Sequence, residues 1–331
     1  MTAAPPVLLE VSRNGLLESR HRGSLVLLDA SGNIEVAVGA PLAPTFPRSS
    51  LKPLQAVTMA TAGFGGGVGH GAGGGASASI ALAAASHDGE DVHLAGVRAI
   101  LAQAGLQESA LQCPEALPAG PAMLSYVAGG GVAARICHNC SGKHAAMLAT
   151  CALNGWSTHD YLARPHPLQA AIRATIELYC AEPITTSGVD GCGAPAHAVS
   201  LVGLASAFAK LVTAADGTAA ADVRRAMQTW PRLIGGTGRP VTELTAAVDG
   251  LLCKDGAEGV WAAAMPGGRA FAVKVEDGSN RALPPLLAAA LAYWGVDNEL
   301  VGRWSSTEVR GGDRTVGAIG WSPELVSLLG L

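Results

Sequence analysis

The sequence predicts an α+β protein in which strands from both ends of the chain form one mostly antiparallel sheet. Residues 7–40 contain short β-rich runs that turn residues separate, as expected of consecutive strands. Near the other end, strands at 260–265 and 269–276 are joined by a Pro-Gly-Gly hairpin signal. Between about 50 and 255 the apolar residues recur mostly at helical spacing. Strands at both ends with helices between them predict a single α+β domain over residues 1–331.

Each element follows from a local pattern of apolar, turn and capping residues. The polar segment 13–23, taken alone, is interpreted as a solvated loop. The expected strands lie at 7–12, 24–29, 34–38 and 315–319, besides the hairpin. The expected helices begin near 50 and then cover 77–86, 91–105, a stretch ending near 153, 167–179, 197–213, 218–230 and 282–294.

Composition excludes several classes of protein. Of the 331 residues, 49% are hydrophobic and only 15% are charged, which is typical of a globular enzyme and not of a disordered chain. A net charge of −4 gives no electrostatic footprint for nucleic acid or an anionic membrane. There is neither an 18-residue apolar run nor a signal peptide pattern. Seven scattered cysteines favour free thiols in the cytoplasm, some of them serving as ligands.

The stretch from Arg48 to Gln55 is the strongest candidate for chemistry. A helix is expected to begin there, with Pro53 in its first turn, so that Ser49 and Lys52 lie on one face. A serine becomes a nucleophile when an adjacent base takes its proton, and a neutral amine is such a base. S-x-x-K is the nucleophile motif of the penicillin-recognising enzymes, but it is short, and a capping serine followed by a surface lysine gives the same pattern.

Two cysteine-containing segments offer metal ligands. Cys137 and Cys140 form a C-x-x-C pair that leads to Lys143 and His144, while Cys192 lies in a loop rich in glycine. Thiolates and borderline nitrogen ligands suit zinc. The spacing leaves open a redox pair and two small buried thiols.

The rarity of lysine adds weight to these segments. The chain contains five lysines and 17 arginines, and arginine supplies its ordinary surface charge. Lysine is retained at Lys52, Lys143 and Lys274, where an amine that can lose its proton is useful, because arginine cannot do so. Lys274 alone is equally consistent with an outward charge on a strand. The glycine-rich tract at 63–75 follows a helix and lacks G-K-[ST], so a flexible loop is favoured over a phosphate loop.

Six motifs stand in one order along the chain, from Glu18 to Gly278. In sequence order they are Glu18-x-x-His21-x-Gly23, Arg48-Ser-Ser-x-Lys52-Pro-x-Gln55, Ala85-Ser86-His87-x-Gly-Glu90, His138-Asn-Cys-Ser-Gly-Lys-His144, Gly188-Val-Asp-Gly-Cys-Gly-Ala-Pro195 and Lys274-x-x-Asp-Gly278. Together they resemble the rhizobial-type (class 3) L-asparaginases of the asparaginase II family, and the chain departs from the pattern in none of them.

The resemblance implies a fold like the serine β-lactamases and serine-dependent glutaminases, with an all-helical region beside the sheet. It implies two Ser-Lys tandems, Ser49 with Lys52 and Ser86 with Lys274. It also implies one Zn²⁺ per chain and a homodimer. The implied zinc ligands are Cys140, Lys143 and Cys192, and the remaining site positions are Arg48, His144 and Asp190. A lysine ligand must be neutral, so zinc binding is expected to weaken as pH falls.

The resulting hypothesis is a cytoplasmic L-asparaginase that converts L-asparagine to L-aspartate and ammonia. Ser49 is expected to attack the side-chain amide with Lys52 as the base, and Ser86 and Lys274 to carry the proton to the leaving ammonia. The roles of the two serines are exchangeable at this stage. A glutaminase or an S-x-x-K esterase fits the same machinery, since fold does not fix substrate. A metal-binding module on an inactive scaffold and a thiol redox protein are alternatives of other classes.

Overall fold

The computed structural model describes residues 4–66, 74–296 and 299–331. They form two compact units, each assembled from separate segments of the chain. Unit 1 contains residues up to 50, 198–212 and 247–331, and unit 2 contains residues 51–197 and 213–246. The prediction of a single domain stays a prediction, and each unit is described by itself.

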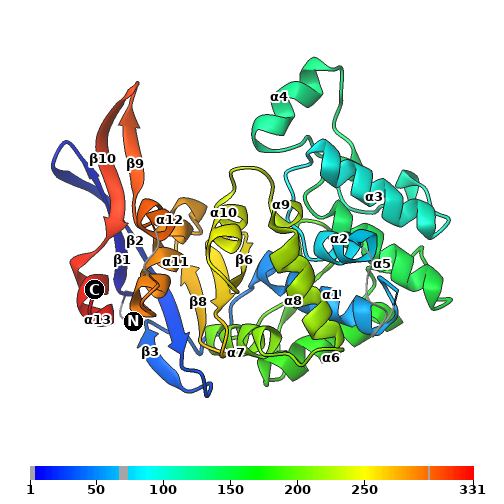
Figure 1. Cartoon of the computed structure of the whole chain (residues 1–331), viewed down its shortest axis with the longest axis horizontal. Coiled ribbons are helices and arrows are strands. Elements are labelled where there is room, and N and C mark those ends of the chain that lie inside the picture. The colour runs from blue at the N-terminus through cyan, green and yellow to red at the C-terminus, as the bar shows by residue number, and fades with distance from the viewer. Residues whose placement is uncertain (1–3, 67–73, 297–298) are drawn as a thin grey trace. The chain divides into compact units, whose positions relative to one another are not determined.

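Unit 1 is built on an eight-stranded antiparallel sheet in the order β6-β7-β8-β2-β1-β10-β9, with β3 paired to β2. Strands from the two ends of the chain lie side by side, since β1 pairs with β10 (blue and red in Figure 1). The strands are β1 (Val7–Arg13), β2 (Leu16–Leu28), β3 (Ile34–Val38), β6 (Leu252–Gly256), β7 (Val260–Ala264), β8 (Ala270–Val275), β9 (Thr307–Gly311) and β10 (Arg314–Trp321).

Helices cover the sheet of unit 1. Every residue of β7 is buried, so both faces of that strand are covered, and α7 and α11 both pack against it. The helices of this unit are η1 (Arg48–Leu51), α7 (Leu201–Val212), η4 (Asn280–Ala282), α11 (Leu283–Tyr293), α12 (Glu299–Trp304) and α13 (Pro323–Leu329).

The interpretation of segment 13–23 as a loop is wrong, because β2 begins at Leu16. Asn14 and Gly15 both have positive φ, at 48° and 80°, as a two-residue hairpin turn requires. The strand that follows is exposed at its start and becomes buried toward Leu28. Segment 13–23 is polar because the first half of β2 is exposed to solvent.

Unit 2 is mainly helical. Helix α1 packs against α2, α5, α6 and α8, and α2 also packs against α3, α5 and α8. Gly142 allows the close contact of α5 with α2, since a Cβ there would lie 2.5 Å from the Leu82 carbonyl oxygen. The elements are α1 (Lys52–Thr61), α2 (Gly74–Ala83), α3 (Asp91–Gln103), η2 (Glu108–Ala110), α4 (Gly120–Ala128), η3 (Arg135–Cys137), α5 (Ser141–Leu153), α6 (Pro167–Cys180), β4 (Ser187–Val189), β5 (Pro195–His197), α8 (Ala219–Thr229), α9 (Pro231–Ile234) and α10 (Pro240–Ala247).

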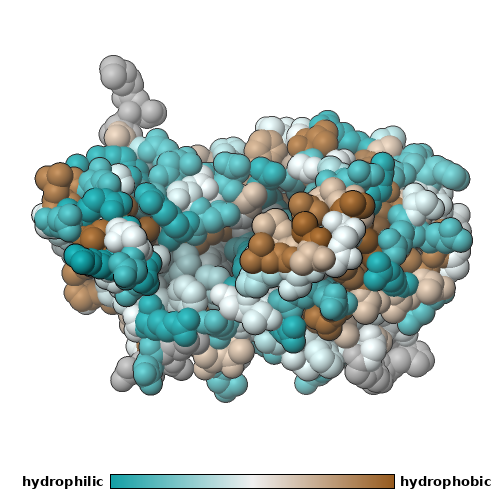
Figure 2. All heavy atoms as spheres, turned by 90° about the horizontal axis from the view of Figure 1, so that it is seen from above, coloured by the Kyte–Doolittle hydropathy of each residue, from teal (hydrophilic) through white to brown (hydrophobic). Residues whose placement is uncertain are grey.

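Two segments of unit 2 differ from a typical packed element. Much of the predicted glycine-rich loop, 67–73, lies outside the described residues, and Gly74 begins α2. Helix α4 buries none of its residues, and Leu124 is 71% exposed. Figure 2 shows hydrophobic side chains gathered over this helix. No helix in the described ranges is long and apolar enough to cross a membrane.

Candidate functional site

Lys52 and Ser86 form the central polar contact of unit 2. Lys52 Nζ lies 3.0 Å from Ser86 Oγ and also donates to the Ala85 carbonyl oxygen. Lys52 is 1% exposed and Ser86 is 6% exposed, so the pair is shielded from water. A hydrogen bond in such surroundings is electrostatically stronger than one in water. This amine and this hydroxyl are therefore held ready to exchange a proton.

The backbone around Ser86 is fixed from two sides. Ser86 N–H donates to the Ile234 carbonyl at 2.8 Å, at the end of α9. His87 Nε2 bonds Ser141 Oγ at 3.0 Å, at the start of α5, and Ser141 in turn donates to a backbone carbonyl. Burial lowers the pKa of His87 well below its ordinary value, so the ring is neutral at pH 7. The loop after α2 thus carries Ser86 on a rigid support.

A second cluster joins the start of α5 to the loop between β4 and β5. Lys143 Nζ lies 3.1 Å from Cys192 Sγ, and both side chains are buried. Gly193, with φ of 88°, closes the tight turn that carries Cys192. The Cys140 thiol and then Lys143 hold the pKa of Cys192 far below its usual range. Burial opposes the charge on Lys143, but Cys192, Cys140 and Asp190 outweigh it and raise its pKa.

This donor set fits a zinc ion once Lys143 has lost the proton that it shares with Cys192. Two thiols and an amine are brought together, and the Lys143–Cys192 separation of 3.1 Å is close to the roughly 3.5 Å between two ligands of a tetrahedral zinc. Among the described residues, no group of three His, Cys, Asp or Glu side chains is arranged for a metal. Cys140, Lys143 and Cys192 do not count as such a group, because one of the three ligands is a lysine.

His144 lies beside this cluster with one nitrogen fixed. Its Nδ1 bonds the Tyr161 hydroxyl at 2.7 Å, while its buried Nε2 has no hydrogen-bond partner of normal geometry within the described ranges. Burial lowers the pKa of His144 to about 4, although the charge of Cys192 acts in the opposite direction. An oriented, neutral imidazole whose second nitrogen lies toward Cys192 is suited to bind a ligand at this cluster. Asp190 Oδ2 is 4.0 Å from Cys192 Sγ in the same loop.

Arg48, Ser49 and Lys274 belong to unit 1. Arg48 has φ of 54°, a left-handed conformation that is uncommon for a residue with a side chain. Ser50 Oγ donates to the Lys254 carbonyl at 3.1 Å and so ties the segment that carries Ser49 to β6. Burial lowers the pKa of Lys274, which favours a neutral amine; Glu258 and neighbouring carboxylates oppose this effect.

The structure brings together some of the residues selected from the sequence. Lys52 contacts Ser86, and Cys140, Lys143, His144, Asp190 and Cys192 form one cluster. The expected pairs Ser49–Lys52 and Ser86–Lys274 each join residues of different units and stay predictions. No local spacing in the sequence signals the contact of Lys52 with Ser86 or that of Tyr161 with His144.

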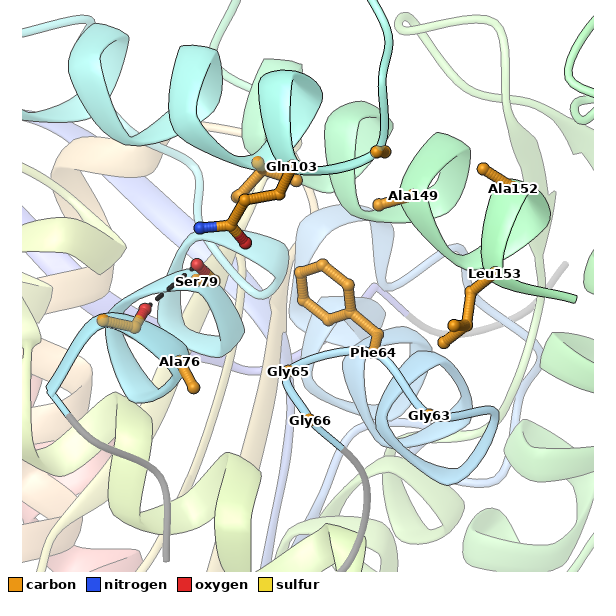
Figure 3. A pocket seen from close by; sticks show the side chains of 13 residues that line it. Gly63, Phe64, Gly65, Gly66, Ala76, Ser79, Gln103, Ala149, Ala152 and Leu153 are labelled. Carbon is orange, nitrogen blue, oxygen red and sulfur yellow. Dashed lines mark hydrogen bonds between the residues drawn. The ribbon is translucent and has the colours of Figure 1, made fainter. Parts of the chain in front are cut away.

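A cavity of about 600 Å³ in unit 2 lies apart from these residues. It is lined by Phe64, Ala76, Gln103 and Leu153 among others (Figure 3). Ser79 Oγ, also in its lining, donates to the Gly75 carbonyl. None of the predicted catalytic or metal-binding side chains lines it, so this cavity is not the candidate site.

The L-asparaginase II family model matches residues 9–321, nearly the entire chain. The chain belongs to the L-asparaginase II family. This result confirms the resemblance on which the sequence analysis relied, and all residues proposed for the site fall within the match.

No curated protein matches this L-asparaginase II family member. Among solved structures, Mglu in its native form is 14% identical, with a TM-score of 0.42 over 78% of this chain and 60% of that chain. Mglu in its native form with 4.3 M NaCl is 15% identical, with a TM-score of 0.36 over 88% of this chain and 66% of that chain. The chain thus spans about three fifths of the length of the first of these structures.

Proposed function

We propose that this protein is an L-asparaginase, an amidohydrolase that converts L-asparagine and water to L-aspartate and ammonia. Family membership supports the choice of reaction. The observation that carries the mechanism is the buried hydrogen bond of 3.0 Å between Lys52 Nζ and Ser86 Oγ. A lysine kept away from water next to a serine hydroxyl can exchange a proton with it, and this supports the proposed relay from Lys52 to Ser86.

In this mechanism Ser49 Oγ attacks the carboxamide carbon while Lys52, neutral, accepts the serine proton. Lys52 passes that proton by way of Ser86 toward the leaving nitrogen, with Lys274 as the second amine of the relay. The C–N bond breaks, ammonia leaves, and an ester joins the aspartyl group to Ser49. Water then attacks the ester, which releases L-aspartate and restores the hydroxyl. Backbone N–H groups near the start of η1 are proposed to stabilise the oxyanion.

Cys140, Lys143 and Cys192 would hold a zinc ion, which would supply a Lewis-acid charge next to His144. Arg48, His144 and Asp190 are proposed to bind the charged ends of the substrate. Arg48 provides a fixed positive charge for a carboxylate, and Asp190 provides an anion for an amino group.

Three finer proposals accompany this one. The fold is proposed to be of the serine β-lactamase and glutaminase type, which the sheet built from both chain ends and the helical unit 2 support. The protein is also proposed to be cytoplasmic and to form a homodimer. Sedimentation equilibrium would test the last point, and a monomer at micromolar concentration would reject it.

The testing experiment measures ammonia release from L-asparagine and L-glutamine side by side with zinc-loaded protein. Release from asparagine at least about tenfold faster than from glutamine is the expected result. No ammonia release from either amide would reject the amidase proposal, and faster release from glutamine would make the protein a glutaminase. Ser49→Ala retaining more than about a tenth of the wild-type kcat would reject Ser49 as the nucleophile, because losing a nucleophile costs several orders of magnitude.

A further inference from the structure

Three side chains of unit 1 form a hydrogen-bonded chain that the proposed reaction does not use. His21 Nδ1 lies 2.7 Å from Asp277 Oδ2, and Arg281 Nε donates to His21 Nε2 at 3.1 Å. An arginine N–H can only donate, so His21 Nε2 must be the acceptor and Nδ1 must carry the proton. His21 is therefore neutral in this arrangement and donates to Asp277. Its side chain is only 3% exposed.

The chain lies where β2 pairs with the end of β8. Ser24 is opposite Lys274 and Gly23 is opposite Val275 in the register. A Cβ on Gly23 would lie 2.4 Å from the Lys274 carbonyl oxygen, closer than any real contact, so only glycine permits this approach. Glu276 N–H then donates to the Arg22 carbonyl at 2.8 Å. The backbone on both sides of Lys274 is thus fixed by the segment of β2 that carries His21.

Asp277 lies in the turn that follows β8, with its two carboxylate oxygens engaged separately. Oδ1 accepts from Ser279 N–H at 2.9 Å, and Oδ2 accepts from His21. Gly278, with φ of 75°, completes the turn. Losing the carboxylate would release the turn that directly follows Lys274 and leave the His21 N–H without its acceptor.

Asp277 also acts on Lys274 through its charge. Burial lowers the pKa of Lys274, while Glu258, Asp277 and Glu276 act to raise it. Burial acts to raise the pKa of Asp277 itself, but the Ser279 N–H and His21 outweigh it, so its pKa is lowered. Asp277 is therefore an anion at neutral pH. Arg281 is a cation that acts on Asp277 in this neighbourhood, and the guanidinium of Arg22, from β2, is bound to the Pro5 carbonyl.

We infer that Arg281, His21 and Asp277 are positioning residues for Lys274: they fix the end of β8 that carries it and hold a negative charge beside its amine. This inference rests on the proposed function, in which Lys274 takes part in the proton relay. It also accounts for why the motifs Glu18-x-x-His21-x-Gly23 and Lys274-x-x-Asp-Gly278 occur together, since His21 and Asp277 are bonded to each other.

The test compares Asp277→Asn with Asp277→Ala. Asparagine keeps one acceptor oxygen, enough for either the Ser279 N–H or the His21 N–H, and removes the charge. The acid limb of the kcat/KM profile should therefore move to lower pH, while the plateau falls by less than in Asp277→Ala. Alanine removes the charge and both hydrogen bonds of the carboxylate. The plateau kcat of Asp277→Ala should therefore fall about tenfold or more, with little change in KM. Glu276→Gln is the matched control, because it removes an adjacent charge outside the hydrogen-bonded chain and should shift the limb less than Asp277→Asn.

A second measurement does not depend on activity. With only five lysines in the chain, the ¹³Cε resonances of labelled lysine can be titrated, and Lys274 is assigned from the signal lost in Lys274→Arg. In Asp277→Asn the Lys274 resonance should titrate at lower pH than in wild type. A superimposable titration, or Asp277→Ala with wild-type kcat, would overturn the inference. A shifted titration in a protein that releases no ammonia would uphold the inference and reject the proposed function.

Discussion

Replacing Gly256 by alanine is expected to disable the enzyme without unfolding it. Gly256 ends β6, where the segment carrying Ser49 packs against that strand. A Cβ there would lie 2.3 Å from the Pro47 carbonyl oxygen and 3.0 Å from Ser50 Oγ. The contact with Pro47 is to a backbone carbonyl, and the Ser50 side chain is fully buried, so neither atom can rotate away from an added Cβ. The segment between them must move.

The size of that movement follows from the contact. An ordinary van der Waals distance begins near 3.4 Å, so the segment must retreat by 3.4 − 2.3, or about 1 Å. Overpacking of this kind costs about 1–3 kcal/mol of stability. A reacting group displaced by about 1 Å loses about 100-fold in rate. We therefore expect kcat to fall about 100-fold in Gly256→Ala, with a lower but cooperative unfolding transition.

Ammonia release under saturating L-asparagine gives kcat, and urea unfolding followed by circular dichroism gives stability. Gly320→Ala, in β10, is the control, because a Cβ there meets nothing within 4 Å and its effect on kcat should be within twofold. Wild-type kcat in Gly256→Ala together with unchanged stability would refute the reasoning, since the close contact would then not hold the Ser49 segment in place.

Three further predictions concern unit 2. Lys52→Met should lower kcat at least about 10³-fold by removing the base, yet leave the unfolding midpoint unchanged or raised, and a lowered midpoint would contradict this. Cys192→Ala should reduce bound zinc, measured by mass spectrometry of the metal, below about a tenth of wild type, while Cys151→Ala retains it. Burial lowers the pKa of His93 in the folded protein. Its neutral form therefore contributes fully to the free energy of unfolding above pH 6.5, the pKa of the unfolded chain, and this contribution is lost as pH falls below that value. The free energy of unfolding should therefore decrease from pH 7 to pH 5 by less in His93→Gln than in wild type.

Local signals in the sequence predicted the elements that are long and strongly patterned. The hairpin at Pro266-Gly-Gly268 joins β7 to β8, and the helix expected over 167–179 is α6, residues 167–180. The polar residues of segment 13–23 favour a loop, whereas the Asn14-Gly15 turn signal is the one that indicates the hairpin leading into β2. Helix α4 was not foreseen, since it exposes apolar residues that normally indicate a buried face.

For the candidate site, the sequence indicated residue types and could not indicate which of them meet. Lys52 and Ser86 are 34 positions apart, one before and one after α2 in the sequence, so their contact depends on how α1 and α2 pack. The same holds for Lys143 and Cys192, which are 49 positions apart. Helix packing is set by many small contacts, such as Gly142 against Leu82. Gly142 lies in one of the six motifs, but its partner Leu82 lies in none of them.

The rarity of lysine acquires a physical meaning from where the lysines lie. Lys52 and Lys143 are both 1% exposed, and an amine in such surroundings is destabilising unless it is paired or neutral. Lys254, equally buried, has Asp255 Oδ1 at 2.6 Å, as expected of a structural ion pair. Lys52 instead donates to neutral oxygens, and no carboxylate among the described residues is paired with it. A fold that leaves Lys52 without an anion gives up stability that a methionine would restore. The predicted behaviour of Lys52→Met, less active yet no less stable, therefore separates a functional lysine from a structural one.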